Sequence, residues 1–182
     1  SIAIRSDSEI VIISENTPSS RARKETFLKI LRDFSFDTEL ILTHEFNYQN
    51  RLSECFRLAR VYAAKFKGKL ILTCNDDIAV SLVKGFEQEK LLPGKDFKLI
   101  SIGNCEQYGF NFFSEPILSS IDMPLHEIAE QSCRLLINLL EKNDEFQHII
   151  KIAGDYVSRK SSEDSTKAKK IRGYSDKRGV LL

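Results

Sequence analysis

The sequence lacks several features that would assign it to a familiar class of protein. It has no apolar run long enough to cross a membrane and no amino-terminal signal segment. The net charge is only +1, so no overall field points to nucleic acid. None of its cysteines stands in a CxxC pair: Cys55, Cys74, Cys105 and Cys133. We therefore expect reduced thiols in a cytoplasmic protein, not a disulfide framework or a zinc site.

The short motifs of common enzymes and metal proteins are missing as well. His44, His126 and His148 are scattered and form no HxH or HExxH pattern. The chain contains no GxSxG, which would mark a serine nucleophile, and neither GxGxxG nor GxxxxGK[ST], which cradle phosphates. We therefore predict that the chain is not an enzyme and that it has no metal site and no cofactor.

Strand-like and helix-like patterns alternate along the first part of the chain. Short apolar runs predict strands, and apolar residues at helical spacing separate them. The predicted strands are Glu9–Ser14, Thr38–Thr43, Lys69–Cys74 and Phe97–Gly103, and the helical stripes are Phe27–Phe34, Leu52–Phe66 and Ile78–Phe86. This alternation predicts an α/β fold, a three-layer αβα sandwich with a mainly parallel sheet. Ligands of such folds bind outside the carboxyl ends of the strands.

The alternation stops after Gly103. An aromatic-rich loop leads to the short extended piece Ile117–Asp122, and an amphipathic helix is predicted from Pro124 to Lys142. One more strand or strand pair is expected in residues 145–161. The segment from Arg159 to Leu182 holds eight Lys or Arg and three Asp or Glu. It reads either as a solvated tail or as an arm that contacts phosphates.

Three polar residues stand where the apolar strand "LILTC" ends. Asn75 or Asp76 could cap the helix that begins near Ile78, or donate and accept hydrogen bonds with a ligand. Asp76 and Asp77 could also form a catalytic acid pair, although adjacent side chains diverge on most backbones. In the same way, the arginines of "SSRAR" are either exposed or reach a ligand, with Arg23 as the candidate for a forked contact.

The order of these segments resembles a known family. "CNDDIAVSLVKGF" followed by "LLPGKDFKLISIG", and later "PILSSID", resembles the effector-binding core of LacI/GalR transcription regulators over Glu9–Ser162. The resemblance implies a type I periplasmic-binding-protein-like fold. It implies that Arg23 and Asn75 hydrogen-bond an effector, that Phe46 stacks on it, and that Asp76 is a companion acid with a structural role.

Several positions depart from the family pattern. Cys105 stands where the family has an effector-binding aspartate, and a thiol cannot accept hydrogen bonds from hydroxyls as a carboxylate does. Either Glu106 replaces that acid or the effector is not an ordinary hexose. Met123 replaces a common glutamine and Thr26 a common glycine. The predicted ligand-binding residues are Arg23, Phe46, Asn75, Asp76, Cys105 and Glu106.

The resemblance also implies a division of the chain. Residues 9–117 would form the carboxyl-proximal lobe of the effector domain, and residues 118–160 the crossover, a helix of the amino-proximal lobe and the returning strand. Residues 161–182 would be a basic, flexible tail. A homodimer would form through the Ala79–Glu89 helix and the Phe97–Ile102 strand. The first residue is Ser1, which is typical of a fragment of a longer protein.

The implied function is that of a ligand-sensing portion of a transcription regulator. A sugar or small metabolite would bind and alter DNA binding by a headpiece that this chain lacks, and no membrane is involved. The alternative is a solute-binding protein for sugar uptake.

Overall fold

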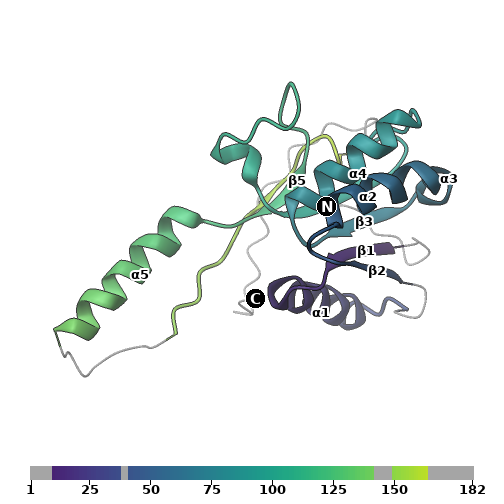
Figure 1. Ribbon diagram of the computed structural model, residues 1–182. Coiled ribbons are helices and arrows are strands. Elements are labelled where there is room, and N and C mark those ends of the chain that lie inside the picture. Colours follow the sequence, from purple (N-terminus) through teal and green to yellow (C-terminus); the bar gives the residue numbers. More distant parts are fainter. Residues whose placement is uncertain (1–9, 38–40, 142–148, 164–182) are drawn as a thin grey trace.

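The computed structural model describes residues 10–37, 41–141 and 149–163, and its centre is one six-stranded sheet. The strand order is β2-β1-β3-β4-β5-β6, and Figure 1 shows β2, β1 and β3 following one another. The strands are β1 (Ile10–Glu15), β2 (Leu42–Phe46), β3 (Leu70–Thr73), β4 (Lys98–Gly103), β5 (Ser119–Asp122) and β6 (Tyr156–Val157). Neighbours among β1–β5 pair in parallel, and only β6 is antiparallel, to β5. The mixed α/β fold with a mostly parallel sheet is confirmed.

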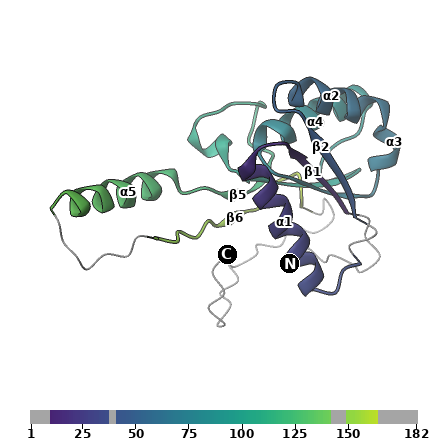
Figure 2. The same ribbon diagram turned by 60° about the horizontal axis from the view of Figure 1, so that its bottom comes forward.

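Helices cover both faces of the sheet. The helices are α1 (Pro18–Asp33), α2 (Arg51–Val61), α3 (Ala63–Phe66), α4 (Asp76–Gln88) and α5 (Leu125–Leu140). Figures 1 and 2 show α1 on one face, and α2 and α4 side by side on the other. The order of the strands reverses between β1 and β3, which makes this the topological switch point of the sheet.

The two core clusters explain why β1 and β3 consist mainly of consecutive apolar residues. Alternate strand residues point to opposite faces, and here both faces are covered. Val11, Ile13, Ile71 and Leu99 pack in the cluster under α2 and α4, whereas Ile10, Ile12, Leu70 and Leu72 pack in the cluster under α1. All the side chains of β1 and β3 are buried.

Two predicted boundaries were displaced. The second strand was expected at Thr38–Thr43, but β2 runs from Leu42 to Phe46 because it pairs with β1 as far as Glu15. β2 is the edge strand, so polar side chains such as Glu45 can lie exposed on it. The stripe from Leu52 to Phe66 is two helices, since Tyr62 leaves helical geometry at φ −114°.

The segment after β5 leaves the body of the molecule. Figures 1 and 2 both show α5 extending away from the sheet, and none of its residues is buried. We call α5 together with residues 149–152 the arm. The chain then returns as the short strand β6, and Asp122 N donates to Asp155 O at 2.7 Å beside it.

Part of the predicted carboxyl end lies outside the described residues. This applies to His148, Lys142 and nearly all of the basic segment after Ser162. In the described part of the chain, no helix is both long and apolar enough to span a bilayer.

Candidate functional site

The carboxyl ends of the five parallel strands meet at one edge of the sheet, as parallel pairing requires. We call this the carboxyl edge. It carries the ends of β1 and β3 at the switch point, where ligands of open α/β sheets bind. The residues predicted to bind a ligand belong to this edge or to the segments directly after it.

Asn75 caps helix α4 directly after β3. Its Oδ1 accepts a hydrogen bond from Ile78 N at 2.9 Å, and its own backbone is extended. Of the alternatives that the sequence left open for Asn75, the cap is present. The cap uses only the oxygen, because the side-chain amide group of Asn75 makes no other hydrogen bond to a described residue. That group, half-buried at the carboxyl edge, keeps its two N–H donors.

Asp76 ties three segments together from a buried position. Its carboxylate accepts from Ser101 Oγ, from Ser120 Oγ at 3.0 Å and from Cys105 N at 2.7 Å. These partners lie on β4, on β5 and at the start of the short helix that follows β4, and Asp76 itself is only 2% exposed. A carboxylate with three donors is satisfied where it is, so Asp76 positions the edge.

Arg23 reaches over the strand ends from helix α1. Nη1 donates to Cys74 O at 2.7 Å, and Nη2 lies 3.2 Å from Met123 Sδ. Arg23 thus links the end of β3 to the end of β5, and its partner Met123 lies 100 residues away from it in sequence. A guanidinium has five N–H donors, so these two contacts leave others for a ligand.

Phe46 ends β2 and is half-buried against the core cluster under α2 and α4. Beside it lies a cluster that the sequence analysis missed. Arg51 Nε is 2.9 Å from the buried carboxylate of Glu15, Arg51 Nη2 is 3.3 Å from Asp77 Oδ2, and the guanidinium stacks 3.9 Å from the ring centroid of Tyr48. The cluster fixes the end of β1 and the start of α4 to the start of α2.

Cys105 is half-buried at the start of the short 3₁₀ helix η2 (Cys105–Tyr108). Burial and the negative charge of Asp76 raise the pKa of its thiol to about 11. The thiol is therefore protonated at neutral pH. It has neither the charge nor the strong acceptor oxygens of the aspartate expected at this position.

Glu106 points into the protein instead of toward the edge. Oε1 accepts from Ile117 N at 3.2 Å and Oε2 from Leu118 N at 3.0 Å, and Arg159 Nη1 lies 3.9 Å from Oε2. Its side chain is only 3% exposed. Glu106 therefore satisfies the backbone before β5, and both its oxygens are occupied.

A second cluster that sequence reasoning missed lies between the loop after β4 and the end of β5. Asn104 Nδ2 donates to Asp122 Oδ1 at 3.0 Å, and Arg159 Nη2 donates to Asn104 Oδ1 at 2.7 Å. The single proton of Tyr108 OH is shared between Met123 O at 2.9 Å and Asp122 Oδ1 at 3.2 Å. Asn104 has a left-handed backbone (φ 53°), which asparagine tolerates well. The available signal was Asp122 at the end of "LSSID", a strand end like that of "LILTC".

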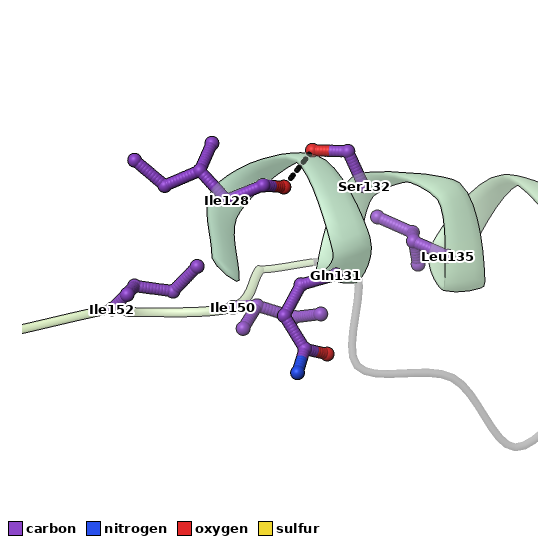
Figure 3. A pocket seen from close by; sticks show the side chains of 6 residues that line it. All are labelled: Ile128, Gln131, Ser132, Leu135, Ile150 and Ile152. Atoms are coloured by element: carbon purple, nitrogen blue, oxygen red, sulfur yellow. Dashed lines mark hydrogen bonds between the residues drawn. The ribbon is translucent and has the colours of Figure 1, made fainter. Parts of the chain in front are cut away.

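The arm holds an apolar pocket, shown in Figure 3. Ile128 and Leu135 of α5 face Ile150 and Ile152 of the returning segment, and Ser132 Oγ donates to Ile128 O at 2.7 Å. This pocket is lined by no charged residue. All its lining residues belong to the arm, which extends away from the sheet (Figure 1). Among the described residues, no group of three or more His, Cys, Asp or Glu could hold a metal ion.

Comparison with known proteins gives one family and several relatives. Residues 8–162 match the family model described as "Periplasmic binding protein-like domain". The chain is 25% identical over 146 residues to the "Ribose operon repressor" of Bacillus subtilis (strain 168), covering 80% of this chain and 43% of that protein. It is 28% identical over 109 residues to the "HTH-type transcriptional regulator LacR" of Lactobacillus helveticus, covering 58% and 32%. The chain thus spans less than half the length of both relatives.

Solved structures show the same fold at low sequence identity. A LacI family transcriptional regulator from Enterococcus faecium with bound ribose has a TM-score of 0.70 at 17% identity, covering 85% of this chain and 56% of that one. A LacI family regulator from Arthrobacter sp. FB24 in complex with lactose has a TM-score of 0.68 at 16% identity, covering 87% and 59%. The dimeric Lac repressor with an 11-residue carboxyl-terminal deletion has a TM-score of 0.71 at 16% identity, covering 86% and 56%.

Proposed function

The chain belongs to the family of periplasmic binding protein-like domains, and on that premise we propose that it is the ligand-sensing portion of a LacI-type transcriptional regulator. The ligand is a sugar or a related small metabolite. The names of both curated relatives describe a repressor or a regulator. These names favour sensing over the alternative, a solute-binding protein for sugar uptake.

One observation carries the proposal. The guanidinium of Arg23 spans from Cys74 O to Met123 Sδ across the strand ends, and the half-buried Asn75 follows Cys74 directly in the chain. N–H donors from α1 and from the cap of α4 thus stand at the switch point of a parallel sheet. A ligand there would accept from Arg23 and Asn75, and Phe46 would offer a flat ring to its apolar face.

The proposed mechanism is ligand binding coupled to a conformational change. The effector would close two lobes on each other and shift the DNA affinity of a headpiece elsewhere in the longer protein, and no bond is made or broken. This chain would supply the carboxyl-proximal lobe with residues 9–117 and the crossover segments with residues 118–160. Residues 161–182 would form the basic tail. The cell compartment in this proposal is the cytoplasm.

The partner in this proposal is a second copy of the protein. The dimer would form through the Ala79–Glu89 helix and the Phe97–Ile102 strand. Helix α4 leaves Lys84, Glu87 and Gln88 exposed, so these side chains are available to a partner. β4 lies between β3 and β5, so its share of the interface would come from side chains on a face of the sheet and not from a free edge.

The experiment is isothermal titration calorimetry of the full-length protein with D-ribose, D-xylose, D-glucose and lactose. Asn75→Asp keeps the oxygen that caps α4 but removes both N–H donors of the side chain, so folding and ligand contact can be separated. We expect a melting temperature near that of the unmodified protein and a Kd about tenfold or more weaker.

Asn50→Ala is the matched control, because Asn50 stands at the start of α2 without a side-chain capping bond. It should bind as the unmodified protein does. Unchanged affinity in Asn75→Asp would remove Asn75 from the site. If the unmodified protein bound none of the four sugars, the proposed class of effector would be wrong.

A further inference from the structure

Four carboxylates stand at or directly after the ends of β3, β4 and β5: Asp76, Asp77, Glu106 and Asp122. Asp76 and Glu106 are buried and fully engaged by donors of the protein itself. Asp77 is exposed and lies 3.3 Å from Arg51 Nη2. Cys105, just after β4, carries a thiol that is protonated at neutral pH. A site for hydroxyl groups at this edge therefore needs its acceptor from elsewhere.

Asp122 is held in place by one oxygen only. Its Oδ1 accepts from Asn104 Nδ2 at 3.0 Å and lies 3.2 Å from Tyr108 OH, whose one proton is shared with Met123 O at 2.9 Å. Within the described ranges, no residue donates a hydrogen bond to its Oδ2. The side chain is half-buried, so Oδ2 can reach a ligand while Oδ1 fixes the orientation of the carboxylate.

The position of Asp122 fits the site already described. In the sheet register Asp122 lies opposite Gly103 of β4. Gly103 in turn precedes Cys105 by two residues. The residue after Asp122, Met123, is the one that Arg23 Nη2 contacts at 3.2 Å. Arg23 and Asp122 therefore form a donor and an acceptor of opposite charge at the same strand end. Such a pair suits a neutral ligand with several hydroxyls, which can accept from one and donate to the other.

We propose that Asp122 is an effector-binding residue, whose carboxylate accepts hydrogen bonds from hydroxyls of a neutral, polyhydroxylated ligand. This carboxylate supplies the acceptor oxygen that the thiol of Cys105 lacks. The inference rests on the proposed sensor function and adds one residue to its site. Asn104 and Tyr108 are positioning residues in this account, because they act through the orientation of Asp122.

Asp122→Asn is the sharpest variant. An asparagine keeps an oxygen for Asn104 and Tyr108 but replaces Oδ2 by an N–H donor. Asp155→Asn is the control, since Asp155 is an exposed side chain beside the same strand end. Calorimetry on the full-length protein with D-ribose, D-xylose, D-glucose and lactose would first establish which sugar binds. The same sugar and its monodeoxy analogues would then be titrated into both variants.

For the sugar that binds, we expect Asp122→Asn to weaken Kd by about 10- to 100-fold and Asp155→Asn to leave it unchanged. One deoxy analogue should bind the unmodified protein and Asp122→Asn equally, because it lacks the hydroxyl that Asp122 receives. A merely structural role would weaken all analogues alike and would overturn the inference, as would unchanged affinity in Asp122→Asn. If the unmodified protein and Asn50→Ala both fold but neither binds a sugar, the proposed function is wrong. The assignment of Asp122, which rests on that function, is then wrong as well.

Discussion

At the scale of single residues, Cys105 offers a direct chemical test. Its thiol has a pKa of about 11 in the folded chain against an ordinary value of 9.0. Only the thiolate reacts with alkylating reagents, so at pH 8 we expect labelling by iodoacetamide about 100-fold slower in the folded chain than in urea. The rate should rise about tenfold per pH unit up to roughly pH 10. Peptide mass spectrometry measures this rate, and a plateau below pH 9 would contradict the assigned environment.

The Arg51 cluster gives a second prediction at this scale. Arg51→Met would leave the Glu15 carboxylate, 7% exposed, without its cation. Removing one partner of a buried pair costs about 3 kcal/mol of unfolding free energy, so the urea midpoint should fall clearly. The double variant Arg51→Met, Glu15→Gln should recover part of the loss, because no buried charge remains.

Arg60 provides the comparison for Arg51. Its pair with Glu89 is 3.4 Å long and solvent-exposed, so Arg60→Met should cost less than about 1 kcal/mol. Equal losses of unfolding free energy in the two arginine variants would show that the buried Arg51–Glu15 pair stabilises the chain no more than the exposed Arg60–Glu89 pair does.

The roles of single polar residues were harder to predict than their positions. Strand ends pointed to Asn75 and Asp76, and both lie at the carboxyl edge. Their hydrogen-bond partners could not be predicted, because Ser101, Ser120 and Cys105 are 25 to 44 residues away from Asp76. Glu106 shows the same limit, since its turn into the protein depends on the backbone of Ile117 and Leu118.

At the scale of elements, burial on both faces made β1 and β3 predictable, because their apolar runs need no alternation. β2 was displaced because an edge strand keeps polar residues and its register follows its partner β1. β6 has two residues and no pattern of its own, so its place beside β5 could not be read locally. The helices followed their apolar stripes except where Tyr62 separates α2 from α3.

The contact between α2 and α4 can be tested at Gly85. A Cβ added there would lie 2.6 Å from Phe56 O and 2.7 Å from Ala59 Cβ. In an open helix, Gly→Ala stabilises by about 1 kcal/mol. Here we expect Gly85→Ala to destabilise the chain by about 1–3 kcal/mol, because the two helices must move apart.

Lys84→Ala, on the exposed face of α4, is the control and should change the urea midpoint little. A higher midpoint for Gly85→Ala would mean that the two helices lie further apart than the structure shows.

At the scale of the whole molecule, the arm stands out because its large apolar side chains are not covered by the sheet and its helices. Leu136, Ile137 and Leu140 of α5 are 58%, 53% and 74% exposed, and Ile149 on the returning segment is 76% exposed. Large apolar surfaces of this kind favour association in water. The 182-residue chain should therefore bind the dye ANS and show a sedimentation coefficient that rises with protein concentration.

The double variant Leu136→Glu, Leu140→Lys should lower both signals, because it places charges on the apolar face without touching the sheet. Leu92→Lys, a substitution of similar size at a side chain 46% exposed outside the arm, should change neither signal. The two variants separate the arm from general surface hydrophobicity. A chain that stays monomeric and dark in ANS without any substitution would mean that the apolar face of α5 is covered in solution.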